Sequence, residues 1–156
     1  MFRPNVRAVI LQIGGNDLAL GVQPISLADD IVNYVDHLHH DLGVPHIFVS
    51  QLLPRFSTDG TGKLRGRRNQ PDETRMLESV YHKNMQHVNH YLEVRLDRPY
   101  SHFRKLHRVK SAPSYLYSDG THLSDGMVDR QYIPERDGMK RYQREIRGIA
   151  LKSVHV

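Results

Sequence analysis

The sequence contains no cysteine and no tryptophan among its 156 residues. Without cysteine the chain can form neither a disulfide framework nor a thiolate metal site. No run of apolar residues approaches the roughly 18 that a membrane-spanning helix needs. The first residues also lack the charged-then-apolar layout of a signal peptide. These absences favour a soluble globular protein in a reducing compartment, and we expect a cytoplasmic location.

The length and charge of the chain predict one domain with a basic surface. A chain of 156 residues is long enough to bury its own core. Lysine and arginine number 22 against 17 aspartate and glutamate residues, which gives a net charge of +5. The excess is concentrated in Lys63–Arg68 and Arg98–Lys110. Such clusters bind nucleic acid in some proteins and are solvated loops in others, and neither stretch contains a recognisable nucleic-acid motif.

Strands and helices are predicted to alternate along the chain. Apolar strands are expected at Val6–Ile13, at His46–Leu53 and between Tyr100 and Val109. Helices are expected from a capping box at Ser26–Asp29 to Gly43, from Asp72 onward, and over Asp137–Ser153, with a loop at Arg55–Pro71. This alternation is typical of the α/β class, in which helices cover both faces of a parallel sheet.

The first predicted strand runs into the sequence Gly14-Gly15-Asn16-Asp17. In an open parallel sheet, ligands bind beyond the carboxyl ends of the strands, and this turn falls there. Glycine lets a ligand approach the backbone closely, and the Asn16 amide can donate to a developing negative charge. Asn16 and Asp17 are also common in turns that bond their own backbone, so the motif alone leaves both interpretations open.

A second motif lies before the last predicted helix, in the sequence "LYSDGTHLSDGM". Asp119 and His122 are three residues apart, a spacing that allows a hydrogen bond across one turn. The carboxylate would then fix the imidazole tautomer and leave the other ring nitrogen free as a general base. A helix-capping aspartate beside a solvent-exposed histidine is the alternative interpretation.

Together the two motifs resemble those of the SGNH hydrolases, the GDSL-type esterases and lipases. "QIGGNDL" resembles the Gly-x-Asn-Asp block of that family, and "YSDGTHLSDGM" resembles its Asp-x-x-His block. The resemblance implies a three-layer α/β/α sandwich with a flavodoxin-like parallel sheet, acting on carboxylic esters without a cofactor or metal. It also implies that Asn16 is an oxyanion donor placed by Gly14 and Gly15, that His122 is the general base, and that Asp119 orients His122.

The serine nucleophile that the family carries in a Gly-Asp-Ser block has no counterpart in this sequence. Ser118 and Ser124 are too close in sequence to His122 to attack from it, and Ser50 is expected to point into packing, so no nucleophile is assigned. The chain is therefore expected to be a partial SGNH-like domain over residues 1–156, lacking the first strand–helix unit. The strand at Val6–Ile13 would then be an exposed apolar edge, open to a partner chain.

Three explanations remain open from the sequence. The chain is a fragment of a longer esterase, a degenerate copy similar to the esterase-like domains of animal retroelement proteins, or a pseudoenzyme that binds through the surviving cleft. The resemblance implies ester hydrolysis as the function. We expect the isolated chain to be inactive, because it lacks the serine nucleophile. The alternative is a non-catalytic binding module that contacts nucleic acid through the basic loops.

Histidine pairs on two predicted helices have the spacing of metal ligands. His37 and His40 precede Asp41, and His87 and His90 repeat the arrangement. Neither pair includes the glutamate of an H-E-x-x-H motif. Exposed helix faces explain both pairs better, and no metal site is predicted.

Overall fold

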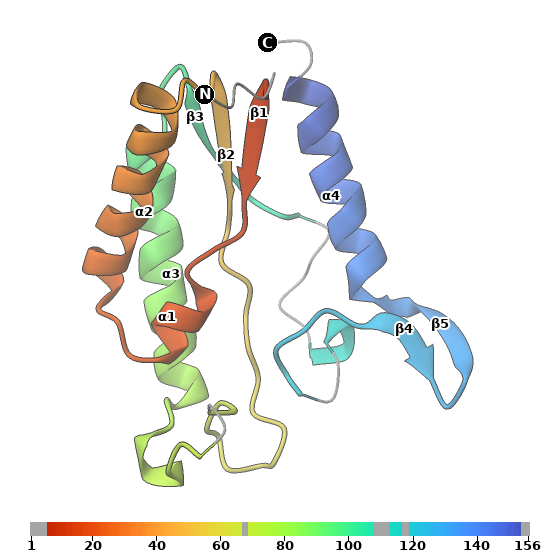
Figure 1. Ribbon diagram of the computed structural model, residues 1–156. Helices are drawn as coiled ribbons and strands as arrows, with labels where there is room; N and C mark the ends of the chain where they lie inside the picture. The colour runs from red at the N-terminus through yellow and green to blue at the C-terminus, as the bar shows by residue number, and fades with distance from the viewer. Residues whose placement is uncertain (1–5, 67–68, 108–112, 117–118, 154–156) are drawn as a thin grey trace.

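The computed structural model describes residues 6–66, 69–107, 113–116 and 119–153 (Figure 1). The strands are β1 (Ala8–Leu11), β2 (His46–Ser50), β3 (Ser101–Arg104), β4 (Asp125–Val128) and β5 (Gln131–Asp137). The helices are α1 (Gly15–Ala19), α2 (Pro24–His40), α3 (Glu78–Arg95) and α4 (Gly138–Ser153), and 3-10 turns occupy Asp72–Thr74 and Pro113–Tyr115. Helices and a parallel sheet are combined, so the predicted α/β class is confirmed. None of the helices in the described ranges is long and apolar enough to cross a membrane.

Three strands form a parallel sheet in the order β1-β2-β3. Val9 pairs with Ile47, and Ile47 pairs with Ser101 on its other side. All three strands lie within the predicted ranges, although each is shorter than predicted. Among the described residues β1 pairs only with β2, so the apolar first strand is an edge strand, as expected.

Helices cover both faces of this sheet (Figure 1). On one face Ile47 and Val49 pack in the main core with buried residues of α2 and α3. These residues are Leu27, Ala28, Ile31, Val32, Val35 and Leu38 from α2, and Tyr81, Met85, Val88 and Leu92 from α3. On the other face lies α4. The sheet is therefore the middle of three layers.

The α4 side of the sheet is more polar than the side facing α2 and α3. Side chains alternate along a strand, so Phe48 and Ser50 of β2 share this face with their pairing partners His102 and Arg104. The ring of His102 stacks on Phe48 with centroids 5.1 Å apart. Burial, together with the charges of Arg104 and His46, lowers the pKa of His102. A titratable group thus occupies a partly buried position in the middle layer.

Helix α2 begins two residues before the predicted capping box. Pro24 is its first residue, and Gln23 precedes it in an extended conformation without a side-chain cap. Proline is well suited to the first helical position, because its φ is preset and its missing N–H is not needed there. The prediction that Ser26 caps this helix is therefore wrong.

Helix α3 begins six residues after the predicted start at Asp72. Asp72–Thr74 forms only a 3-10 turn, and Leu77 is extended before Glu78. Leu77 bridges to Lys63 in an antiparallel pairing, which holds this segment out of the helix.

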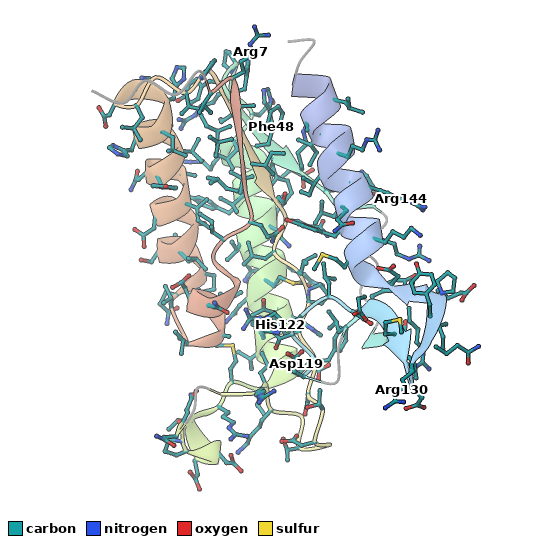
Figure 2. All side chains as sticks on the ribbon, turned by 45° about the vertical axis from the view of Figure 1, so that its right-hand side comes forward. Arg7, Phe48, Asp119, His122, Arg130 and Arg144 are labelled. Atoms are coloured by element: carbon teal, nitrogen blue, oxygen red, sulfur yellow. The ribbon has the colours of Figure 1, made fainter. Side chains whose placement is uncertain are left out.

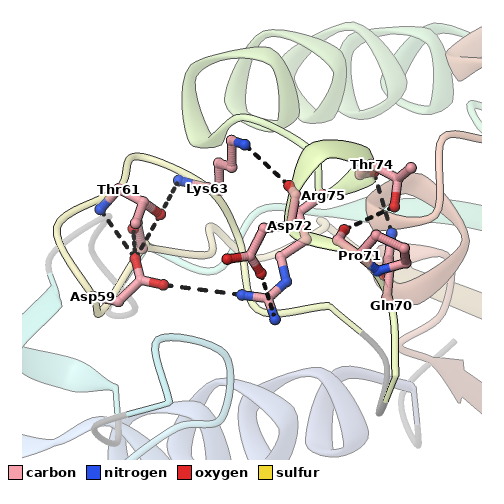
Figure 3. Close-up of polar contacts among 9 residues, drawn as sticks. Asp59, Thr61, Lys63, Gln70, Pro71, Asp72, Thr74 and Arg75 are labelled. Carbon is pink, nitrogen blue, oxygen red and sulfur yellow. Dashed lines mark hydrogen bonds and ion pairs between the residues drawn. The ribbon is translucent and has the colours of Figure 1, made fainter.

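The predicted loop after β2 is held by its own polar contacts (Figure 3). Asp59 accepts hydrogen bonds from the hydroxyl of Thr61 at 2.6 Å and from its backbone N–H at 3.0 Å. These bonds, with one from Ser57, lower the pKa of Asp59 to about 2. Arg75 forms an ion pair with Asp72 at 2.9 Å, which closes the far end of the loop.

The antiparallel hairpin β4–β5 was not predicted. Its two-residue turn consists of Asp129 and Arg130, which have φ values of 47° and 66°. Turns of this hand are usually marked by glycine or asparagine, and arginine gives no such signal. Helix α4 follows directly and begins at Gly138, within one residue of its predicted start, where the Asp137 carboxylate accepts the N–H of Lys140 at 2.6 Å.

Candidate functional site

Three segments that are distant in the sequence form one cleft of about 420 Å³. Its walls are residues 12–17 after β1, Leu52–Arg55 after β2, and Thr121 with His122, and Tyr81 of α3 also lines it. Because β1 and β2 are parallel, the first two walls lie beyond the carboxyl ends of neighbouring strands. The cleft contains the predicted residues Gly14, Gly15, Asn16 and His122.

The turn after β1 requires glycine at position 14 and is closely packed at position 15. Gly14 has a φ of +94°, and a Cβ added there would lie 3.1 Å from Cδ1 of Ile31. A Cβ on Gly15 would lie 3.3 Å from Nη2 of Arg55 and 3.5 Å from the hydroxyl of Tyr81. The two glycines therefore allow the turn to sit close to α2 and to the Arg55 side chain.

Asp119 and His122 lie next to one another (Figure 2) and form the predicted hydrogen bond. Nδ1 of His122 lies 2.6 Å from Oδ2 of Asp119, while Oδ1 accepts the backbone N–H groups of Thr121 at 2.9 Å and His122 at 3.0 Å. Burial raises the pKa of Asp119, but the hydrogen bonds from His122 and Thr121 outweigh it and lower the value to about 2. With Asp119 ionised, the shared proton is placed on Nδ1, so Nε2 of neutral His122 is free to accept a proton.

The loop that carries His122 is fixed to the second wall through Gly120. The N–H of Phe56 donates to the carbonyl of Gly120 at 2.9 Å. A Cβ on Gly120 would lie 2.0 Å from the carbonyl oxygen of Phe56, so only glycine allows this approach. Gly120 thus holds His122 at the cleft, with Asp119 behind it, and the sequence pattern predicted no role for this glycine.

Asn16 is held by a residue that the sequence analysis did not assign. Nη2 of Arg55 donates to Oδ1 of Asn16 at 2.5 Å. Because Oδ1 accepts this bond, the NH₂ group of Asn16, which lines the cleft, remains available as a donor. The only signal in the sequence is that Arg55 follows Pro54 directly after the second predicted strand.

Helix α3 holds the Leu52–Arg55 wall with two side chains. The amide of Asn89 accepts the N–H of Leu52 at 2.7 Å and donates to its carbonyl at 3.2 Å. The hydroxyl of Tyr81 donates to the carbonyl of Leu53 at 3.0 Å. Burial raises the pKa of Tyr81, and the nearby Arg55 partly opposes this increase. The wall thus obtains from α3 the backbone partners that a strand would otherwise supply.

No serine lines this cleft in the described part of the chain. Ser50 is fully buried in β2, as expected, and Ser124 is 5% exposed and bonded through Oγ to the N–H of Gly126. Ser118 lies outside the described residues. Among the described residues, Thr121 and Tyr81 are the lining side chains that carry a hydroxyl.

The histidine pairs on the helices form no metal-binding group in the described ranges. His37 is instead bonded through Nδ1 to Asp41 at 2.6 Å. His87 and His90 line an open groove with Ile25 on the outer side of α2 and α3.

A scan against protein-family models and a search of curated proteins both found no match to this chain.

Proposed function

We propose that the chain provides the oxyanion-donor and acid–base part of an SGNH-type ester hydrolase and binds carboxylic esters in the cleft. The observation that carries the proposal is that Asn16 and His122, which lie on opposite halves of the chain, line the same cleft. The hydrogen bond from His122 to Asp119 supports the general-base role. The parallel sheet β1-β2-β3 also agrees with the flavodoxin-like parallel sheet that the family resemblance implies.

Each group has a role in ester chemistry. The free NH₂ of Asn16 donates to the carbonyl oxygen, on which negative charge develops during attack. Nε2 of His122 accepts the proton of the attacking hydroxyl or water, and Asp119 stabilises the imidazolium that forms. Without a serine in the described cleft, the chain alone forms no acyl-enzyme. Loss of the serine from such a triad lowers kcat by about 10⁶, so the expected behaviour is binding without useful turnover.

The basic clusters give less support to the nucleic-acid alternative. Lys63 donates to the carbonyl of Asp72 at 3.0 Å, Arg98 is paired with Asp36, and Lys105 is paired with Glu93 at 2.6 Å. These cations are already engaged within the protein. Arg65 is exposed and Arg104 lies over the ring of Phe48 at 5.1 Å, and neither forms an ion pair with a described residue. The other arginine and lysine residues of the two clusters, at positions 67, 68, 108 and 110, lie outside the described part of the chain.

The proposal is tested by titrating the ¹⁵N-labelled protein with methyl butyrate and following amide and imidazole signals by NMR. We expect shifts centred on Asn16, Gly15 and His122, and the affinity should fall in Asn16→Ala. His90→Ala is the control, because this exposed histidine lies on α3 away from the cleft. An absence of shifts at the cleft, or shifts that persist unchanged in Asn16→Ala, would contradict ester binding there.

A fluorophosphonate probe tests the missing nucleophile separately. Intact mass after labelling is expected to show no adduct, because the probe reacts with activated serines. A single stoichiometric adduct would mean that the chain contains a nucleophile, and the proposal of binding without turnover would be wrong.

A further inference from the structure

Arg55 is a half-buried cation that lines the cleft. One of its N–H groups is used by Asn16, and its guanidinium carbon lies 5.7 Å from the ring centroid of Tyr81. Tyr81 is fully buried and is fixed by its hydrogen bond to the carbonyl of Leu53. The guanidinium of Arg55 therefore packs against an aromatic ring that is held in one position. The side chain is therefore held in place before any ligand arrives.

No carboxylate in the described residues forms an ion pair with Arg55, although Asp17 lines the same cleft. Arg104 and Arg141 are likewise half-buried without an ion pair to a described residue, whereas two other half-buried arginines are paired. Arg75 is paired with Asp72, and Arg98 is paired with Asp36. A partly desolvated guanidinium without a counter-ion is unfavourable unless it is placed to receive an anion. Arginine also has five N–H donors in a fork that matches a carboxylate, and Asn16 uses only one side of it.

We propose that Arg55 makes the cleft selective for esters that carry a carboxylate close to the ester group. This inference rests on the proposed function and names its substrate class. Arg55 is bonded to Asn16 itself, so the carboxylate and the ester carbonyl must be separated by only a few bonds. Half-esters of short dicarboxylic acids, such as monomethyl succinate, have this arrangement.

The test compares two probes of similar size, monomethyl succinate and the neutral dimethyl succinate. Affinities are measured by NMR titration of the wild-type chain and of the variants Arg55→Gln and Arg55→Lys. A charge-assisted hydrogen bond in a partly exposed site corresponds to a preference of about tenfold for the half-ester. The ratio of the two affinities is expected to fall to about one in Arg55→Gln, even where both probes lose affinity because Asn16 has lost its partner, and to persist in reduced form in Arg55→Lys.

Arg95→Gln is the matched control. Arg95 lies 5.4 Å from the ring of Tyr91 on α3, is exposed and does not line the cleft. Its loss changes the net charge by the same amount as the loss of Arg55. The preference for the half-ester should therefore survive in Arg95→Gln, and its disappearance there would overturn the proposal by showing that overall charge is the cause.

The outcomes separate this inference from the proposed function. Equal affinity for the two probes in the wild type, or a preference that survives in Arg55→Gln, overturns the role of Arg55 and leaves ester binding standing. Failure of both probes to bind overturns the proposed function and this inference with it. If Arg55→Gln does not fold, Arg55→Lys and about 0.5 M salt serve instead: weaker preference under both supports the role, and an unchanged preference contradicts it.

Discussion

Asp119 divides its two carboxylate oxygens between a side chain and the backbone. Oδ2 holds the imidazole of His122, and Oδ1 accepts two backbone N–H groups. The second set of bonds fixes the carboxylate independently of the imidazole. The orientation of His122 therefore does not depend on the side chain itself being buried, and that side chain is 76% exposed.

Replacing Asp119 with asparagine should alter both the histidine tautomer and the response to acid. The pKa of Asp119 is lowered to about 2 in the folded chain, below its value of about 3.9 when unfolded. The ionised carboxylate therefore stabilises the fold above about pH 4, and this contribution is lost as the pH falls toward 2. The free energy of unfolding, measured by urea titration, should therefore fall less in Asp119→Asn than in the wild type as the pH is lowered from about 4 toward 2.

The tautomer is read separately, from the imidazole ¹⁵N shifts of His122. Neutral His122 should carry its proton on Nδ1 in the wild type and show a mixture of tautomers in Asp119→Asn. The same single tautomer in both proteins would mean that Asp119 does not set it.

The sequence predicts some residues of the site and misses others for a clear reason. Asn16 and the Asp119–His122 pair are recognisable because their chemistry is carried by short motifs. Arg55 contacts Asn16, and Gly120 contacts Phe56. Both contacts join segments that are far apart in the sequence, so no local sequence pattern indicates them. The family assignment and the roles of the motif residues stay predictions.

Among the elements, the contact between α3 and the chain after β2 determines the shape of the cleft. Asn89 bonds both backbone groups of Leu52, which is itself 1% exposed. A buried backbone N–H or carbonyl without a partner destabilises a fold by about 1–3 kcal/mol. A single amide side chain on a helix therefore continues the hydrogen bonding of the sheet beyond its last pair.

Asn89→Leu should lower the free energy of unfolding by about 2–4 kcal/mol, because two buried backbone groups lose their partners while the side-chain size is conserved. Urea denaturation measures the change. Asn84→Leu is the control, since Asn84 lies on the same helix and its side chain forms no hydrogen bond with a described residue. Equal losses in the two variants would show that the Leu52 contact is not the cause.

Element types were easier to predict than element ends. The apolar runs of β1, β2 and the inner face of α2 mark the elements, because burial imposes a period on the sequence. The start of α3 depends on the pairing of Leu77 with Lys63, and the hairpin turn places Arg130 at positive φ. Both are set by partners elsewhere in the fold.

For the whole molecule, the pH response should be dominated by histidine. The chain carries eleven histidines on top of a net charge of +5, so acidification adds positive charge to an already basic surface. His102 adds a local effect, because burial, Arg104 and His46 lower its pKa. On acidification, His102 therefore becomes protonated at a higher pH in the unfolded chain than in the folded chain. The free energy of unfolding should fall as the pH drops below about 6.5.

Thermal unfolding at about pH 7.5 and 5.5 measures this response. The melting temperature should fall on acidification, and about 0.5 M salt should recover part of the loss by screening the added charge. His102→Gln should show a smaller fall than the wild type, whereas His90→Gln, at an exposed position on α3, should behave like the wild type. A fall that is identical in the wild type and in both variants would contradict the role of His102.

The positions of the cleft walls in the sequence also determine the order in which they are synthesised and so when the cleft can form. The turn at Gly14–Asp17 and the Leu52–Arg55 segment leave the ribosome early, and α3 follows with the contacts that hold them. His122 is added only after the parallel sheet has been made, and it is held through Gly120. A nascent chain can therefore complete its core while the ligand site is still unfinished, and acquires the site only when the Asp119–His122 loop closes onto Phe56.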